Sequence, residues 1–150
     1  MVSEWGYERT YYYNGEYHVI VGLGTNGFIV SAYPIRKRKS GDCIMLTLKI
    51  MNEFIHSPIW TYEDGFITDD LPIIANDYEL QNIANQIEAL FSRYYEFDSH
   101  DQACWFNHEK EKADKELMLD LISKLIARLN ELNDGSYVIE DCETERLKNL

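Results

Sequence analysis

The sequence predicts an α+β protein, in which an antiparallel β-sheet precedes two long amphipathic helices. Aromatic and polar residues alternate through the first third of the chain between Asn-Gly dipeptides, a pattern typical of antiparallel hairpins. Apolar residues then recur at steps of three and four in residues 80–97 and again in residues 117–132, as they do along one face of a helix. Strands and helices therefore fall in separate parts of the chain, without the β-α-β alternation of a parallel sheet.

Three strands are expected at residues 8–13, 16–23 and 28–33. The dipeptides Asn14-Gly15 and Asn26-Gly27 separate them, and both residue types tolerate the positive φ angles of tight hairpin turns. The sheet is therefore predicted to begin as a three-stranded meander.

The rest of the predicted sheet region runs to residue 72. Pro34 is expected to end the third strand, and the polar residues 36–42 are expected to form a loop. A fourth strand is predicted at residues 44–51, although their Leu, Met and Lys residues also fit a helix. A short hairpin around Asp64-Gly65 then leads to the helices.

The first helix is predicted to begin with Asn76 as its N-cap, because Glu79 stands three residues later as in a capping box. Its apolar face is expected to consist of Leu80, Ile83, Ile87, Leu90, Tyr94 and Phe97. The second helix carries Met118, Ile122, Leu125, Leu129 and Leu132 at the same spacing. Gly135 is expected to terminate it, so the helical region covers residues 76–134.

Residues 98–116 are highly polar, and the sequence leaves open whether they form a kink, a loop or continuous helix. Two separate helices with a break near Asp98-Ser99 are expected. In the tail, residues 135–150, a short strand is predicted at 137–139 and a frayed helix at 143–150. Without repeats or a linker, residues 1–150 are predicted to form one domain.

The charge is strongly acidic and uneven. The net charge is −12, with six Lys/Arg against nine Asp/Glu in residues 1–75 and eight against seventeen in residues 76–150. Such a charge opposes direct nucleic-acid binding and favours a basic partner. No apolar run reaches the length of a membrane span, no leader pattern is present, and the three cysteines are widely spaced. A cytoplasmic protein with reduced thiols is expected.

The pattern Gly22-x-Gly24-x-x-Gly27 matches the G-x-G-x-x-G of dinucleotide-binding loops. Such a loop must open a helix whose N-terminus faces the pyrophosphate, whereas the residues after Gly27 are expected to continue as a strand. The pattern is therefore interpreted as a hairpin turn, and no cofactor is predicted.

His100, Cys104 and His108 would share part of a face if their segment were helical, and imidazole with thiolate suits zinc. A helix drifts by about 40° every four residues, so the three cannot converge on one ion. No metal site is therefore predicted. A metal- or thiol-dependent enzyme centred on these residues is kept as an alternative to the leading hypothesis.

The leading hypothesis is a small acidic binding protein without enzymatic activity, such as a stoichiometric inhibitor or an immunity or anti-defence protein. It would act on a basic or nucleic-acid-handling protein, because complementary charge speeds encounter. The expected contacts are the aromatic residues Tyr11 and Tyr13 and the helical acids Asp114, Glu116 and Asp120.

The basic run Arg36, Lys37, Arg38 and Lys39 could hold a phosphate or an acidic patch of a partner, or could simply be a solvated loop. A homo-oligomer whose helical stripes pair between subunits is the remaining alternative. The partner's identity, the order of the strands and the oligomeric state do not follow from the sequence.

Overall fold

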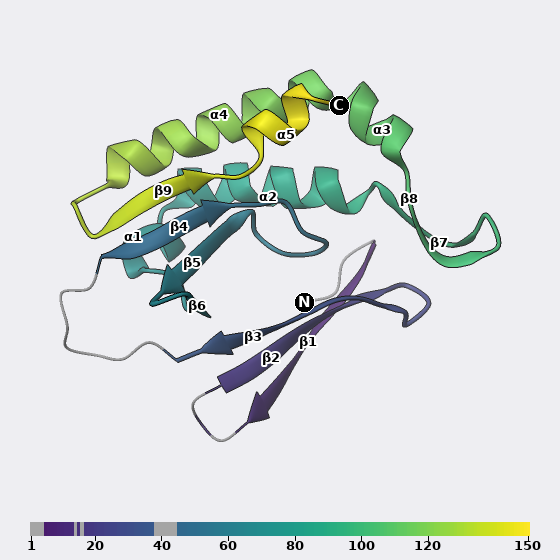
Figure 1. Ribbon diagram of the computed structural model, residues 1–150, viewed down its shortest axis with the longest axis horizontal. Coiled ribbons are helices and arrows are strands. Elements are labelled where there is room, and N and C mark those ends of the chain that lie inside the picture. The colour runs from purple at the N-terminus through teal and green to yellow at the C-terminus, as the bar shows by residue number, and fades with distance from the viewer. Residues whose placement is uncertain (1–4, 14, 16, 38–44) are drawn as a thin grey trace.

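The computed structural model describes residues 5–13, 15, 17–37 and 45–150, with the side chains of residues 12 and 13 left out of the description (Figure 1). Its described strands form a seven-stranded sheet in the order β1-β2-β3-β6-β5-β4-β9 and a separate hairpin, β7-β8. Helices α2 and α4 lie along the β4-β5-β9 part of the sheet (Figure 1). The predicted α+β class is confirmed.

The first three strands form an antiparallel arm: β1 (Gly6–Tyr13), β2 (Tyr17–Gly24) and β3 (Ile29–Arg36). The chain reverses after β2 where Gly27 has a φ of 81°, so the hairpin interpretation of the glycine pattern is confirmed. Gly24 also lies so close to the ring of Phe97 that a Cβ atom on it would stand 2.1 Å from that ring. The arm therefore packs closely against the β7-β8 hairpin.

The prediction that Pro34 ends the third strand is wrong. Pro34 lies inside β3, opposite Val19 of β2. In an antiparallel pair, a residue directs its N–H and C=O both toward the partner strand or both away from it. Proline has no N–H, so Pro34 fits a position whose backbone groups point away from β2.

The second group of strands consists of β4 (Leu46–Ile50), β5 (Ile59–Glu63), β6 (Phe66–Thr68) and β9 (Tyr137–Asp141). Strands β4, β5 and β6 are antiparallel, and the predicted turn at Asp64 and Gly65 is confirmed by φ angles of 50° and 79°. Strand β9 pairs in parallel with β4, which brings residues about ninety positions apart side by side. The predicted tail strand is thus an edge strand of the main sheet.

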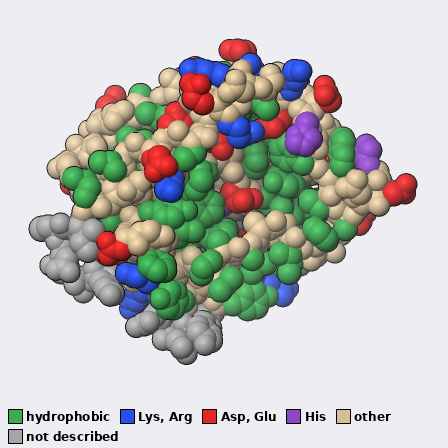
Figure 2. All heavy atoms as spheres, viewed as in Figure 1, with side chains coloured by type: hydrophobic (Ala, Val, Ile, Leu, Met, Phe, Trp, Pro, Cys, Tyr) green, Lys and Arg blue, Asp and Glu red, His purple; other side chains and the backbone are tan. Residues whose placement is uncertain are grey.

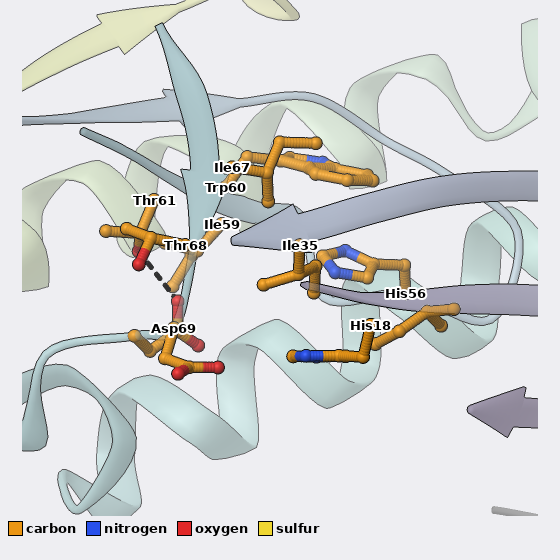
Figure 3. Close-up of a pocket in the computed structure, with 11 residues that line it drawn as sticks. His18, Ile35, His56, Ile59, Trp60, Thr61, Ile67, Thr68 and Asp69 are labelled. Carbon is orange, nitrogen blue, oxygen red and sulfur yellow. Dashed lines mark hydrogen bonds between the residues drawn. The ribbon is translucent and has the colours of Figure 1, made fainter. Parts of the chain in front are cut away.

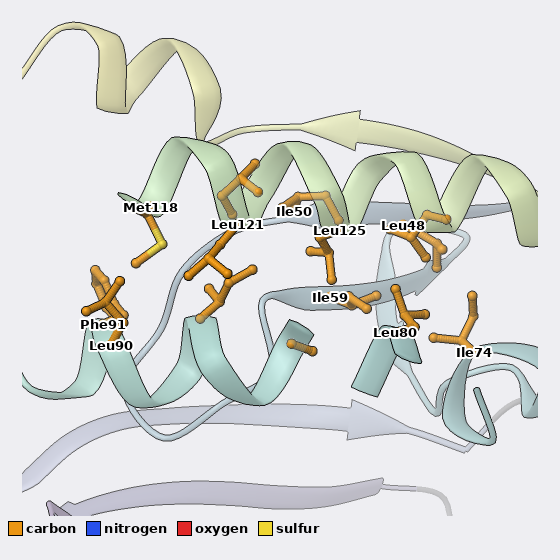
Figure 4. Close-up of a cluster of buried hydrophobic side chains, with 14 of the residues drawn as sticks. Leu48, Ile50, Ile59, Ile74, Leu80, Leu90, Phe91, Met118, Leu121 and Leu125 are labelled. Carbon is orange, nitrogen blue, oxygen red and sulfur yellow. The ribbon is translucent and has the colours of Figure 1, made fainter. Parts of the chain in front are cut away.

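The core lies between this group of strands and the helices α1 (Pro72–Ala75), α2 (Tyr78–Ser92) and α4 (Lys115–Leu132) (Figure 4). Alternate residues of β4 are buried, as expected for a strand with one covered face. The fully buried aliphatic residues of the cluster are Leu48, Ile50, Ile74, Leu80, Ala84, Ile87, Ile122, Leu125, Leu129 and Leu147. Both predicted amphipathic helices are therefore present, and their apolar faces are buried within this chain.

The details of the first helix differ from the prediction. Its N-cap is Asp77, whose carboxylate accepts a hydrogen bond from the Leu80 amide at 2.8 Å, because Asn76 already terminates α1. The helix ends at Ser92, so Tyr94 and Phe97 are outside it. Arg128 of α4 binds the same Asp77 carboxylate at 2.7 Å, which ties the start of α2 to α4.

Residues 98–116 contain no continuous helix. After α2 the chain forms the hairpin of β7 (Tyr95–Ser99) and β8 (Gln102–Phe106), then α3 (His108–Ala113). Positive φ angles at Asp98, His100 and Asp101 make the tight reversal between the strands. The expected separation of two helices is correct, but the hairpin between them was not predicted.

The C-terminal helix α5 (Thr144–Lys148) is not frayed, because Leu147 is 0% exposed within the core. Arg146 on the same helix pairs with Glu111 of α3 at 2.6 Å and with Glu143 at 2.8 Å. The side chains of these two glutamates are only 3% and 7% exposed. The guanidinium is thus the cation that compensates two buried carboxylates.

Replacing Arg146 by Met is expected to lower the free energy of unfolding at pH 7 by about 2 kcal/mol. Removing one partner of a buried ion pair costs more than this, but the guanidinium is 39% exposed and partly screened by water. Denaturant titration of the variant gives the value. Adding Glu111→Gln is expected to recover most of the loss, and an unchanged deficit in the double variant would contradict the explanation.

Candidate functional site

The seven-stranded sheet is split between the arm and its remaining strands. Among the described residues, β3 pairs with β6 at the single position Arg36↔Thr68, in parallel. Figure 1 shows the arm diverging from the layer of β4, β5 and β9 away from that point. Two cavities lie along this split and share Trp60 and Ile67 in their walls.

The larger cavity has a volume of about 500 Å³. One wall is residues 30–33 of β3, and the other consists of Met51, Asn52, Glu53, Trp60, Tyr62 and Ile67. The open edge of β3 therefore borders a space large enough for several side chains.

The backbone of β3 offers hydrogen-bonding groups to this space. Since Pro34 points its backbone groups away from β2, the alternation along a strand gives Ala32 and Arg36 the same direction. Arg36 uses this direction to pair with Thr68, which supports the assignment. No described strand continues the ladder along Ala32, so its N–H and C=O are directed toward the cavity.

Buried side-chain atoms without partners surround the same cavity. The amide nitrogen and oxygen of Asn52 and the hydroxyl of Ser31 are shielded from water and lack a hydrogen-bond partner among the described residues. An unsatisfied buried polar group costs about 1–3 kcal/mol, so such groups need an explanation. Ser31 and Asn52 thus place unsatisfied polar atoms in the walls of the cavity, behind its accessible surface.

An aromatic cluster of Tyr33, His56 and Trp60 stands where the two cavities meet. The His56 ring is stacked on Trp60 with centroids 3.8 Å apart, and Tyr33 packs edge-on against both. The Nδ1–H of His56 donates to the carbonyl of Ser57, which leaves Nε2 as an acceptor. Burial lowers the pKa of His56 to about 4, so the ring is neutral at pH 7.

Three carboxylates lie near Tyr33: Glu8 on β1, Glu53 before β5 and Glu88 on α2. Burial raises the pKa of each, and the charge of Glu8 raises that of Glu88 further. No Lys or Arg in the described part of the chain forms an ion pair with any of the three. Figure 2 shows acidic atoms at the centre of this face, surrounded by hydrophobic side chains. The site therefore favours a cation.

The smaller cavity, of about 210 Å³, lies on the β6 side of the split (Figure 3). Its apolar walls are Ile20, Ile35, Ile59, Trp60 and Ile67, and its polar lining is His18, His56, Thr61, Thr68, Asp69 and Asp70. The side chains of His18 and Asp69 point toward one another (Figure 3). The Thr61 hydroxyl donates to Asp70 at 2.7 Å, which fixes that carboxylate at the rim.

The expected partner contacts do not form one surface. Tyr11 is 52% exposed on β1, and the side chain of Tyr13 lies outside the described residues. Asp114, Glu116 and Asp120 lie at the start of α4, on the opposite side of the molecule from the end of β1 (Figure 1). Asp114 accepts a hydrogen bond from Tyr94 at 3.1 Å and Asp120 pairs with Lys124 at 2.7 Å, so both have intramolecular roles.

His100, Cys104 and His108 do not share a helix face. His100 is in the β7-β8 turn, stacked on Trp105 at 3.7 Å, whereas Cys104 pairs with Phe97 and His108 begins α3. No group of three or more potential metal ligands occurs among the described residues. Burial raises the pKa of Cys104, which disfavours the reactive thiolate.

The predicted basic loop is described only in part. Arg36 ends β3 with its guanidinium 4.6 Å from the centre of the Phe66 ring, and Lys37 is exposed. Arg38 and Lys39 lie outside the described residues. The prediction of a phosphate or partner contact at this run is therefore not tested.

The cluster of Tyr33, His56 and Trp60 could not be predicted from the sequence, because it forms from three separate segments. Aromatic residues are common in strands, and only the divergence of β3 from β6 places these together.

The scan against family models and the searches of curated proteins and of solved structures found no match to this chain. None of the helices in the described ranges is long and apolar enough to cross a membrane.

Proposed function

We propose that this protein is a small acidic binding protein that takes an extended, basic segment of a partner protein into the split between β3 and the β5-β6 hairpin. The observation that carries the proposal is the open edge of β3, which borders a cavity of about 500 Å³. We further propose that it acts stoichiometrically, as an inhibitor or immunity-type protein, in the cytoplasm.

The backbone supports the extended form of the ligand. A strand added to a sheet edge gains main-chain hydrogen bonds, while alternate side chains enter pockets beside it. The outward-directed groups of Ala32 would supply the main-chain bonds.

The charges support the basic character of the ligand. Glu8, Glu53 and Glu88 are partly buried and form no ion pair with a described Lys or Arg, and a lysine or arginine beside them would favour their charged forms. The ring of Tyr33, which lines the larger cavity, would add cation–π attraction. The net charge of −12 would steer such a partner toward the protein.

The alternatives have less support. The thiol- or metal-dependent enzyme needed His100, Cys104 and His108 on one face, and they lie on a turn, a strand and a helix start. A homo-oligomer that pairs through its helices requires exposed apolar helix faces, but Leu80, Ile122 and their neighbours are buried within the chain. The split beside β3 is therefore the better basis for a function.

Replacing Ala32 by Pro is expected to weaken binding of the partner segment by at least about tenfold, because it removes one main-chain donor and blocks close approach to the edge. Random peptides displayed on phage and selected on the wild-type protein supply the ligands. Their affinities for wild type and variant are then measured by fluorescence anisotropy.

Ala32→Ser is the matched control, because it changes the side chain and keeps the N–H donor. Its affinity is expected to stay within about twofold of the wild type. Thermal melts establish that both variants fold. A selection without enriched Lys- or Arg-containing peptides, or peptides that bind Ala32→Pro as tightly as wild type, would refute the proposal.

A further inference from the structure

A strained turn stands beside the larger cavity. Residues 53–56 form a tight turn in the loop between β4 and β5, closed by an antiparallel bridge between Glu53 and His56. At its third position Ile55 has a φ of 51°, where turns usually carry Gly or Asn and where a β-branched residue is rare. Strain of this kind persists only where the surrounding structure enforces it, and it clusters at functional sites. The side chains that the turn positions are therefore of functional interest.

The surrounding structure fixes both central residues of the turn. The N–H of Ile55 donates to the buried hydroxyl of Ser92, the last residue of α2, at 3.0 Å. The ring of Phe54 is buried against Tyr95 and Phe97 of β7, whose ring centroids are 4.9 Å and 5.7 Å away. Rotation of the Phe54–Ile55 peptide would relieve the positive φ, but it would turn the N–H away from Ser92 and leave it unpaired. The Ser92 hydroxyl therefore holds the strained conformation.

The turn holds Glu53 in the wall of the larger cavity. Oε1 of this carboxylate accepts a hydrogen bond from the Phe54 N–H at 2.7 Å, which restrains its orientation. No hydrogen bond or ion pair with another described residue engages Oε2. Burial raises the pKa of Glu53, as expected for a carboxylate without a compensating cation. Lys49 does not supply that cation, because its ammonium group lies over Tyr62 and pairs with Glu140.

From this geometry we infer that the larger cavity is a binding site for the ammonium group of a lysine side chain, with Glu53 as its specificity-determining residue and Ser92 as the positioning residue. As regards the origin of that lysine in a partner segment, the inference rests on the proposed function. A guanidinium binds a carboxylate best through both oxygens, whereas an ammonium group is a compact charge that needs only one. Since Oε1 is engaged by Phe54, the remaining oxygen suits lysine better than arginine.

Preorganisation gives the strained turn a purpose at this position. A carboxylate that is already held in place loses little side-chain freedom on binding, so more of the charge attraction appears as affinity. The ring of Tyr33 lies in the same cavity wall and would add cation–π attraction to the ammonium group. Without the Ser92 hydroxyl the turn could relax, and Glu53 would lose its fixed position while the apolar part of the cavity would stay.

The test uses N-acetyl-lysine methylamide as the probe and N-acetyl-norleucine methylamide, which has the same carbon side chain without the ammonium group, as its neutral counterpart. Both are titrated at pH 7 into the whole ¹⁵N-labelled protein, and the amide signals of Ala32, Glu53 and Phe54 are followed. The lysine probe is expected to bind with a Kd in about the millimolar range, as a small fragment should. The norleucine probe is expected to bind at least about tenfold more weakly, because it makes no charge-assisted hydrogen bond.

Glu53→Gln is expected to reduce the ratio of the two affinities to below about twofold. Ser92→Ala is expected to reduce it at least about threefold, and to have no further effect on the ratio in the Glu53→Gln background. Ser57→Ala is the matched control, because it removes another hydroxyl that accepts a backbone N–H next to the turn, that of Ile59, at 3.2 Å. Its ratio is expected to stay within about twofold of the wild type.

Thermal melts establish that the variants fold. Ser92→Cys, whose sulfur is a weaker acceptor of similar size, replaces Ser92→Ala if that variant does not fold. Equal binding of the two probes, or a ratio that Glu53→Gln leaves unchanged, would overturn the role of Glu53. A loss of affinity for both probes alike with the Ser92 variant would mean a structural role only and would overturn its assignment as the positioning residue.

The outcomes separate the lysine site from the proposed function. If selected peptides bind and lose affinity with Ala32→Pro, but tolerate replacement of their lysines by norleucine, the function stands and the lysine site is refuted. If the probes and variants behave as expected and no peptide is enriched, the lysine site stands and the function is refuted.

Discussion

Lowering the pH from 7 to 4 is expected to remove about 3 kcal/mol of folding free energy through His56. Burial between Trp60 and Tyr33 lowers its pKa from 6.5 to about 4, so the folded protein keeps the ring neutral after the unfolded chain has protonated it. Each pKa unit corresponds to about 1.4 kcal/mol. The loss begins as the pH falls through about 6.5 and levels off below about 4.

Other groups at the site act in the opposite direction. Because burial raises the pKa of Glu8, Glu53 and Glu88, their protonation favours the folded state as the pH falls. His56→Phe isolates the histidine, since Phe keeps an aromatic ring beside Trp60 and does not titrate. Urea denaturation at pH 7 and pH 4 gives, for each protein, the unfolding free energy that is lost on acidification. The wild type is expected to lose about 3 kcal/mol more than the variant, and equal losses would exclude this role of His56.

Leu147→Ala is expected to lower the free energy of unfolding by about 3 kcal/mol, although only three residues follow it in the sequence. The side chain is 0% exposed and belongs to the cluster between the sheet and α4. Truncating it removes apolar contacts and leaves a cavity that the rigid β9 and α4 cannot fully close. Denaturant titration at pH 7 measures the change.

Leu117→Ala is the matched control, because the same atoms are removed from a leucine that is 52% exposed on α4. Its cost is expected to stay below about 1 kcal/mol. A Leu147→Ala variant as stable as Leu117→Ala would mean that α5 does not contribute to the core.

The correct sequence predictions concern features with local causes. The turns at Asn26-Gly27 and Asp64-Gly65 follow from the tolerance of these residues for positive φ angles, and both are present. The helix Lys115–Leu132 follows from an apolar periodicity that only a helix can place on one face. The same rule failed at Tyr94 and Phe97, because a residue of the turn after α2 and a residue of β7 happened to continue the spacing of α2.

The candidate site depends on contacts between distant segments. Pro34 is predicted to end a strand, and it can lie inside β3 only because no described strand pairs with this position on the side away from β2. In the sequence, His56 is indistinguishable from an ordinary loop histidine. Only its burial against Trp60 and Tyr33 lowers its pKa and keeps the ring neutral. Neither property follows from the identity of the neighbouring residues in the chain.

The sequence by itself determined the α+β class, the arm hairpins and the two amphipathic helices, because turn propensity and hydrophobic periodicity act over a few residues. The tertiary structure alone decided that β9 joins β4, that the sheet splits beside β3, and that α5 is buried. These features are pairings across long sequence separations, whose free energy depends on which surfaces meet and exclude water. The acidic charge was visible in the composition, but the fold determines which carboxylates lie near Tyr33 beside the split.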